Sequence, residues 1–205
     1  MSNIILESVR GMEVLPIDDV FLRDRKVFLV GTVNDESCNA LIKDLLYLEA
    51  EDNTKPITIF INSPGGDVSS GLAVYDTLRL MKSPVTAVVT GIAASMGSII
   101  LLGCDADRRM MLPNSKVMIH DCSWGRHEMG GKKPFEVEEE LNQLKQTNER
   151  LVAILAERTG RSKEEIAEVT KADSYFNAEE AIAFGLASAV IDSDSLNRIL
   201  KKGEA

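Results

Sequence analysis

The segment Ile57-Thr-Ile-Phe-Ile-Asn-Ser-Pro-Gly-Gly-Asp67 defines the fold class of this chain. Its first five residues are all β-branched or aromatic, which is typical of a buried strand, and the residues from Asn62 onward favour a turn. A helix is predicted directly after it, over residues 68–81. A buried strand followed by a helix is the basic unit of an α/β protein.

The same alternation extends to both sides of this segment. Apolar runs predict strands at residues 27–30, 85–90 and 116–119, and helix signals predict helices at 35–50 and 95–102. Strands joined by crossover helices imply an α/β fold with a mostly parallel sheet core. In such folds, ligands gather at the carboxyl ends of the strands.

The C-terminal part is predicted to be mainly helical. Residues 121–134 are rich in glycine and predict a flexible segment, which a helix of about 36 Å follows over residues 135–158. The apolar stripe of this helix suits an oligomer contact and equally suits packing on its own core. Further predicted elements are a helix after the capping box Ser162-Lys-Glu-Glu165, a helix from Asn177 to Phe184 that ends at Gly185, and a strand in 186–191.

Composition limits the classes of function. The length of 205 residues suits a single domain, 1–205, and 44% hydrophobic with 27% charged residues is typical of a soluble globular protein. A formal net charge of -9 disfavours nucleic acid and anionic membrane surfaces as partners.

The compartment is expected to be the cytoplasm, with bacteria as the first choice and an organelle left open. Residues 1–10 show neither a secretory signal nor an Arg-rich transit peptide. Residues 83–104 are uncharged and long enough to span a bilayer, but their glycines favour a buried strand, a turn and a short helix instead. Cys38, Cys104 and Cys122 contain no CxxC pair, which fits a reducing compartment, and only two histidines are present, which nearly excludes a multi-histidine metal site.

Ser95 is the candidate nucleophile. It lies at a predicted helix start among small residues, where a substrate can approach closely and the first helical N–H groups face developing negative charge. The N–H groups of Gly66 and Met96 are the candidate donors of an oxyanion hole. An isolated serine at such a place more often only caps a helix, two glycines more often form only a tight turn, and the GxSxG pattern of α/β-hydrolases is missing.

His120 is the candidate general base, because it follows an apolar strand and therefore lies at the same end of the sheet as Ser95. His127, in the glycine-rich segment, is the weaker candidate. A third group has to orient the imidazole, and spacing alone leaves Asp121, Asp173 and Asp192 open.

Four ordered segments resemble the proteolytic subunits of the Clp protease, the ClpP family, and the resemblance runs from about residue 8 to residue 192. They are Ile61-Asn-Ser-Pro-Gly-Gly66, Ala93-Ala-Ser-Met-Gly97, Leu112-Pro-Asn-Ser-Lys-Val-Met-Ile-His120 and the segment from Ala178 to Gly185-Leu186. The resemblance implies a ClpP/crotonase-like fold and a serine endopeptidase with Ser95 as nucleophile, His120 as base and Asp173 as third triad member. It also implies that Gly66 and Met96 donate to the oxyanion, and that this subunit needs no metal and no cofactor.

The resemblance implies an assembly as well. Two stacked heptameric rings, a homo-oligomeric tetradecamer, would enclose a chamber in which unfolded polypeptides are cleaved. A partner AAA+ unfoldase ring would use the ATP. Residues 1–20 would form an N-terminal axial segment, with 2–15 as the gate, and residues 121–160 would form a protruding handle region that interlocks the rings.

Several positions depart from the family pattern. Ile92 stands in place of the usual Gln, Asp121-Cys122 in place of Gln-Pro, and Lys171-Ala172 in place of an acidic residue and Arg. These departures leave the coupling of the rings and the choice of unfoldase open. The alternative functions are a non-catalytic or regulatory ring subunit of a mixed Clp assembly, an acyl-CoA enzyme of the crotonase group and a Ser-Lys peptidase that uses Lys116. The complete set of Ser95, His120 and Asp173 argues against all three.

Overall fold

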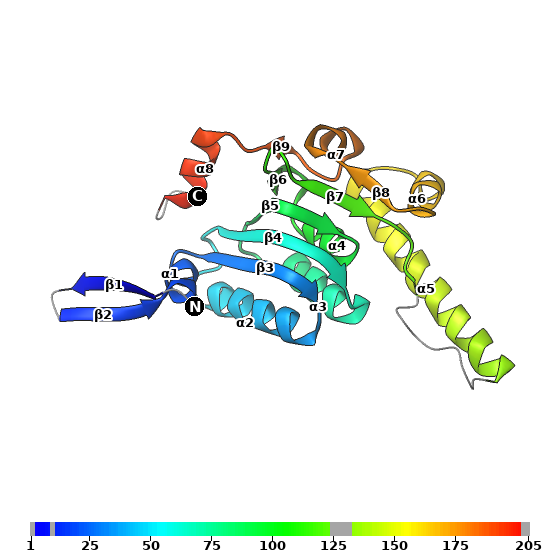
Figure 1. Cartoon of the computed structure of the whole chain (residues 1–205), viewed down its shortest axis with the longest axis horizontal. Helices are drawn as coiled ribbons and strands as arrows, with labels where there is room; N and C mark the ends of the chain where they lie inside the picture. Colours follow the sequence, from blue (N-terminus) through cyan, green and yellow to red (C-terminus); the bar gives the residue numbers. More distant parts are fainter. Residues whose placement is uncertain (1–2, 9–10, 124–132, 202–205) are drawn as a thin grey trace.

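A seven-stranded sheet forms the centre of the molecule in the computed structural model, which describes residues 3–8, 11–123 and 133–201 (Figure 1). Neighbouring strands along its main path are all parallel. In spatial order these strands are β3 (Lys26–Val33), β4 (Ile57–Gly66), β5 (Val85–Ala94), β6 (Arg109–Met111) and β9 (Ala189–Val190). The predicted α/β fold with a mostly parallel sheet is confirmed.

Strand β5 is long enough to pair with two successive strands. Its residues 87–89 pair with β6, and its residues 92–94 pair with β7 (Lys116–Ile119), in both cases in parallel. Strand β8 (Ser174–Phe176) then runs antiparallel to β7. The carboxyl ends of β5 and β7 and the amino end of β8 therefore lie together.

Helices α2 (Asp35–Glu51), α3 (Val68–Leu80) and α4 (Met96–Gly103) cover one face of the sheet (Figure 1). All eight residues of α4 are buried, as expected for a helix that is apolar on every side. A smaller apolar cluster around Phe60 and Val88 includes Ile199 of α8 (Ser193–Leu200). The main core thus lies between the sheet and the three helices that connect its strands.

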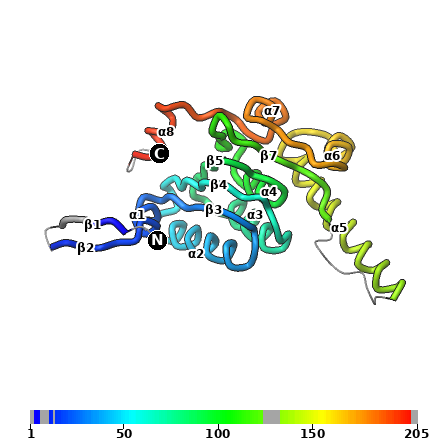
Figure 2. The backbone as a smooth tube through the Cα atoms, in the orientation of Figure 1, coloured from blue at the N-terminus to red at the C-terminus, as the bar shows by residue number. Residues whose placement is uncertain are grey.

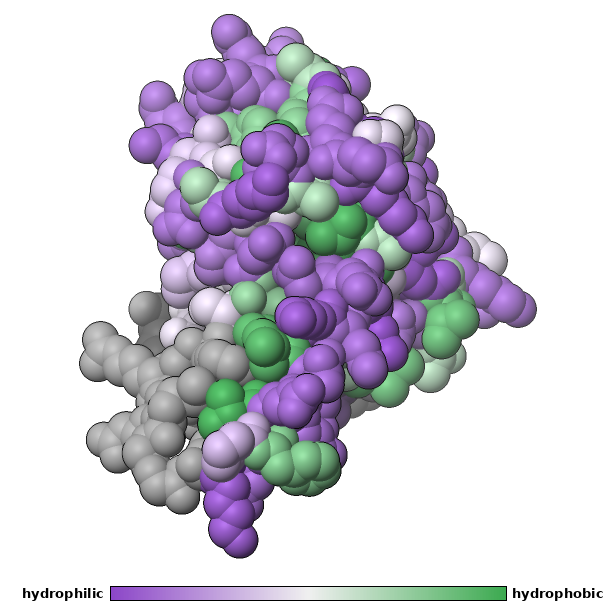
Figure 3. Space-filling view, turned by 90° about the vertical axis from the view of Figure 1, so that its right-hand side faces the viewer, coloured by the Kyte–Doolittle hydropathy of each residue, from purple (hydrophilic) through white to green (hydrophobic). Residues whose placement is uncertain are grey.

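Two elements project from this body in opposite directions (Figure 2). One is the hairpin of β1 (Asn3–Ser8) and β2 (Gly11–Pro16), which α1 (Ile17–Arg23) joins to the sheet. The other is the long helix α5 (Pro134–Thr159), whose buried residues, Leu151, Val152, Leu155 and Ala156, all belong to its second half. The face of the molecule on the α5 side is mostly hydrophilic with separate hydrophobic patches (Figure 3).

The C-terminal helices begin where the sequence signals place them. The side chain of Ser162 accepts a hydrogen bond from the N–H of Glu165 at the start of α6 (Lys163–Thr170). Asn177 caps α7 (Ala178–Phe184) in a capping box, and Gly185 ends that helix in the left-handed conformation. The start of α6 at Ser162 and both ends of α7 are confirmed, but α6 has only the serine half of its predicted capping box, because the Glu165 carboxylate pairs with Arg161 instead.

Some predictions differ from the structure. The turn predicted from Asn62 is instead a continuation of β4, because Thr32 and Val33 pair with Gly65 and Gly66 after a shift in register. The strand predicted in 186–191 shrinks to β9. The elements that the sequence analysis did not predict are all short: β1, β2, α1, β6, β8 and α8. Several predictions fall partly or wholly outside the described residues: the flexible segment and the handle region (their residues 124–132), His127, and the axial segment with its gate (residues 1, 2, 9 and 10).

Residues 83–104 form β5 and α4, as predicted, but β5 continues through Gly91 to Ala94, so the sharp turn falls at Ser95 and not at a glycine. Across the ranges that the structure describes, no helix is both long enough and apolar enough to cross a bilayer.

Candidate active site

Ser95 lies in the turn between β5 and α4 with a strained backbone. Its φ of 53° and ψ of -121° belong to a region that costs a non-glycine residue on the order of 1–3 kcal/mol. The Ser95 N–H donates to the carbonyl of Met118 in β7 over 2.9 Å, which holds the turn against the neighbouring strand. A serine strained at a strand-to-helix turn is the arrangement of a nucleophile elbow, although the GxSxG pattern is absent.

Gly65 packs directly against this turn, and the next residue, Gly66, packs against β3. A Cβ atom on Gly65, whose φ is 88°, would lie 2.6 Å from the carbonyl oxygen of Ala94 and 2.7 Å from the Cβ of Ser95. A Cβ on Gly66 would lie 2.1 Å from the carbonyl oxygen of Val33. Because no side chain fits at Gly65, the backbone of β4 reaches the serine turn itself, and the missing side chain of Gly66 lets the same segment lie close to β3.

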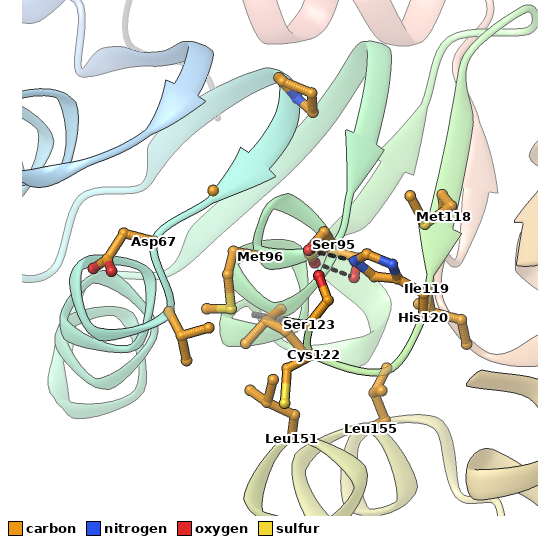
Figure 4. A pocket seen from close by; sticks show the side chains of 15 residues that line it. Asp67, Ser95, Met96, Met118, Ile119, His120, Cys122, Ser123, Leu151 and Leu155 are labelled. Atoms are coloured by element: carbon orange, nitrogen blue, oxygen red, sulfur yellow. Dashed lines mark hydrogen bonds between the residues drawn. The ribbon is translucent and has the colours of Figure 1, made fainter. Parts of the chain in front are cut away.

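The β7–β8 ladder brings His120 and Asp173 together. Ile119 pairs with Ser174, so the next residues outward on these antiparallel strands face each other. His120 Nδ1 lies 3.1 Å from Asp173 Oδ1. On its other side, His120 Nε2 lies 2.9 Å from Ser95 Oγ, the contact that Figure 4 shows. A carboxylate only accepts hydrogen bonds, so Nδ1 carries the proton and Nε2 accepts from the Ser95 hydroxyl.

The other two candidate carboxylates have different contacts. Asp121 Oδ1 accepts a hydrogen bond from the Thr170 hydroxyl over 2.6 Å. Asp192 caps α8, and its bonds from the hydroxyl and the N–H of Ser195 lower the pKa of its carboxyl. Of the three aspartates that spacing left open, the structure places Asp173 against His120.

A cavity of about 520 Å³ adjoins Ser95 and His120. Its wall is mainly apolar, with Val68, Met96, Ile99, Met118, Leu151 and Leu155 among the lining residues. Leu151 and Leu155 come from α5 and close one side of the cavity (Figure 4). The sequence indicated them only as part of an apolar stripe, and no signal in it connected that stripe to the serine.

Two other polar groups beside the cavity are engaged elsewhere. Asp67 caps α3, and its hydrogen bonds from the N–H and hydroxyl of Ser70 lower the pKa of its carboxyl. Burial raises the pKa of the Cys122 thiol, which keeps it protonated and a poor nucleophile near neutral pH. Within residues 3–8, 11–123 and 133–201, no three His, Cys, Asp or Glu side chains gather closely enough to hold a metal ion.

The arrangement suits acyl transfer. A serine hydroxyl is aimed at an imidazole nitrogen, a carboxylate orients the other nitrogen, and the first N–H groups of α4 lie beside the serine. A family model described as Clp protease matches residues 9–194, a range that includes all seven strands of the sheet and each residue of this arrangement. The chain therefore belongs to the Clp protease family and is a peptidase of the Clp type.

Proposed function

We propose that this chain is a serine endopeptidase in which Ser95, His120 and Asp173 form the catalytic triad. The observation that carries the proposal is the continuous hydrogen-bonded series from Ser95 Oγ through both nitrogens of His120 to Asp173, with distances of 2.9 Å and 3.1 Å. The apolar cavity beside the serine gives a substrate side chain a place to bind.

The proposed reaction starts when Ser95 Oγ attacks the carbonyl carbon of a peptide bond and His120 Nε2 takes the hydroxyl proton. The new C–O bond converts the carbonyl into a tetrahedral oxyanion. His120 then gives the proton to the leaving amine as the C–N bond breaks, and water hydrolyses the acyl-enzyme by the same route. Asp173 keeps the proton on Nδ1 and stabilises the imidazolium that forms in each step.

The N–H groups of Met96 and Gly66 are the proposed donors to the oxyanion. Met96 is the first residue of α4, so its N–H has no acceptor within the helix. Gly66 directly follows Gly65, whose missing side chain lets the β4 backbone reach the serine turn. The proposed reaction uses neither a metal nor a cofactor in this subunit.

Membership of the family supports a wider proposal about the assembly. In it, two stacked heptameric rings of this chain enclose a chamber, and a separate AAA+ unfoldase ring spends ATP to deliver unfolded polypeptides. The α5 helix, within the handle region 121–160, projects from the body and exposes 72% of Phe135, which suits a contact between rings. The β1–β2 hairpin, within residues 1–20, is the proposed axial segment, and the cytoplasm is the proposed compartment.

The decisive experiment compares the purified wild type with Ser95→Ala in the hydrolysis of a fluorogenic peptide that has an apolar residue before the cleaved bond. Removing the nucleophile should lower kcat by about 10⁴-fold or more. Ser188→Ala is the matched control, because the Ser188 hydroxyl donates to the carbonyl of Arg109, outside the site, and this variant should keep the wild-type rate. Each sample is also sized by light scattering, so that an unassembled sample is recognised.

Two outcomes would contradict the proposal. Full activity of Ser95→Ala would show that another group is the nucleophile. A wild-type particle of ring size that stays inactive with a partner unfoldase would instead favour a non-catalytic or regulatory subunit.

A further inference from the structure

Asp121 follows His120 directly and makes two short hydrogen bonds with one residue of α6. Its N–H donates to the carbonyl of Thr170 over 2.7 Å, and its Oδ1 accepts from the Thr170 hydroxyl over 2.6 Å. Thr170 is only 1% exposed, so this contact is shielded from competing water. The residue after the proposed base is thus attached to the last turn of α6.

This attachment continues the ladder that carries the proposed triad. Counting outward along β7 and β8, the facing residues are first Ile119 and Ser174, then His120 and Asp173. The Asp121–Thr170 contact lies just beyond them. His120 and Asp173 therefore lie between a paired strand on one side and a two-bond contact on the other.

Residues 171–173 form a short bridge that is fixed at its ends. At one end Thr170 is bonded to Asp121, and at the other Ser174 is paired with Ile119 and donates its hydroxyl to the carbonyl of Val169 over 2.7 Å. Within the bridge, Lys171 forms an ion pair with Glu168 on the surface, and Ala172 has no polar side chain.

Burial does little to hold Asp173, because 59% of its side chain is exposed. Its position consequently depends on where the two ends of the bridge are fixed. A displacement of a positioning group by about 1 Å can reduce a reaction rate by as much as about 100-fold. The Asp121–Thr170 contact is therefore close enough to the chemistry to affect it without touching the substrate.

We propose that Asp121 and Thr170 are positioning residues, whose two hydrogen bonds hold Asp173 where its carboxylate orients His120. The inference rests on the proposed serine peptidase function and adds a role that acts through Asp173.

Thr170→Val tests the role, because valine keeps the shape of threonine and removes the hydroxyl. We expect a kcat about tenfold lower with a nearly unchanged KM, since a positioning defect acts on the transition state. Thr170→Ser restores the hydroxyl and should recover most of kcat. Thr77→Val is the matched control, because the Thr77 hydroxyl bonds the carbonyl of Ala73 within α3, away from the ladder.

A double-mutant cycle separates positioning from general loss of structure. If Thr170 acts through Asp173, then Thr170→Val should cause no further loss of kcat in an Asp173→Ala background. Asp121→Ala should behave like Thr170→Val, and Asp121→Asn, which keeps an oxygen acceptor, should retain most of kcat. The two Asp121 variants also keep the test valid if Thr170→Val does not fold.

The outcomes are distinct. Wild-type kcat in both Thr170→Val and Asp121→Ala, or a tenfold loss that persists without Asp173, would overturn this inference alone. Labelling of Ser95 by a fluorophosphonate probe reports the proposed function independently. A wild type that neither hydrolyses peptide nor takes up the probe would overturn the proposed function and this inference with it.

Discussion

The two halves of the proposed site are held in place by different forces. Ser95 lies between β5 and a helix in which every residue is buried, and Gly65 fits against it with no room for a methyl group. His120 follows the four-residue strand β7, Asp173 precedes the three-residue strand β8, and 59% of the Asp173 side chain is exposed. Close packing fixes the nucleophile half, whereas hydrogen bonds fix the base half.

This difference explains why the strained residue is on the packed side. The positive φ of Ser95 costs on the order of 1–3 kcal/mol. Burying one large aliphatic side chain contributes about 1.5–3 kcal/mol, and α4 buries Ile99, Ile100, Leu101 and Leu102 together. A hydrogen bond contributes only about 0.5–1.5 kcal/mol, so the base half has less free energy with which to hold a strained geometry.

Among changes that leave the three proposed triad residues in place, the largest expected effect comes from adding a methyl group to the packed half. In Gly65→Ala the new Cβ would meet Ala94 and Ser95 at 2.6 Å and 2.7 Å, so the serine turn must shift. We expect kcat/KM to fall by about 100-fold, as for a reacting group misplaced by about 1 Å. Peptide hydrolysis measures the loss of activity of the variant, and thermal unfolding measures the loss of stability that the displaced turn causes.

Gly160→Ala separates backbone strain from steric overlap. Gly160 has a similar φ of 76°, but nothing lies within 4 Å of the place that a methyl group would occupy there. The variant should lose about 1–2 kcal/mol of stability, the cost of a left-handed alanine, and keep its kcat. Equal losses of activity in Gly65→Ala and Gly160→Ala would show that packing against Ser95 is unimportant.

The packed half is also the half that the sequence predicts best. Its signals are local: an apolar strand, two glycines, a serine at a helix start and an apolar helix follow one another within residues 57–103. The structure adds the positive φ of Ser95, which depends on the contact with β7 and has no signature of its own in the sequence.

The base half depends on pairing between distant segments, and spacing alone left three aspartates open for it. Ile119 and Ser174 are neighbours only because β8 returns antiparallel to β7, and a three-residue strand carries almost no periodic signal. The role of Asp121 is hidden for the same reason, since its partner Thr170 lies in another helix. Long-range pairing therefore limits how much of the site can be derived from local pattern.

The rate at which cysteines are alkylated also compares the packed half with the base half. A protected cysteine reacts only when the structure around it opens locally, so its rate reports how easily that half opens. Burial raises the pKa of Cys104 to about 12 at the end of α4, and it also raises the pKa of the half-buried Cys122 beside His120. At pH 8 we expect iodoacetamide to modify Cys122 at least about tenfold faster than Cys104. Peptide mapping by mass spectrometry at successive times gives both rates.

Asn148→Ala sharpens this measurement. It removes the Oδ1 that accepts the N–H of Cys122 over 3.0 Å, so it should accelerate modification of Cys122 and leave Cys104 unchanged. Identical rates for the two cysteines in the wild type would mean that both halves open only when the whole domain unfolds.

The smallest expected effect concerns a hydrogen bond inside the packed half. At the start of α3, Asp67 accepts hydrogen bonds from the N–H and from the hydroxyl of Ser70, each over 2.7 Å. These two bonds hold the pKa of the Asp67 carboxyl below its ordinary value near 3.8. Asp67→Ala should therefore cost about 1 kcal/mol of unfolding free energy at pH 7. The Ser70 hydroxyl also lies 2.6 Å from Asp35 Oδ1, so it keeps an acceptor and the loss is limited to the backbone cap.

The pH dependence has a definite sign, because a lowered pKa in the folded state stabilises the protein only while the carboxylate is ionised. The difference between wild type and Asp67→Ala should be complete above about pH 5 and should shrink as the pH falls below about 3.8 and through the folded pKa. Asp67→Asn keeps a capping oxygen that does not titrate, so its stability should change less with pH than that of the wild type. Urea unfolding at pH 7 and pH 3 measures all three proteins. A pH-independent difference between wild type and Asp67→Ala would assign the contribution of Asp67 to packing, like that of its neighbours Gly65 and Gly66, rather than to its charge.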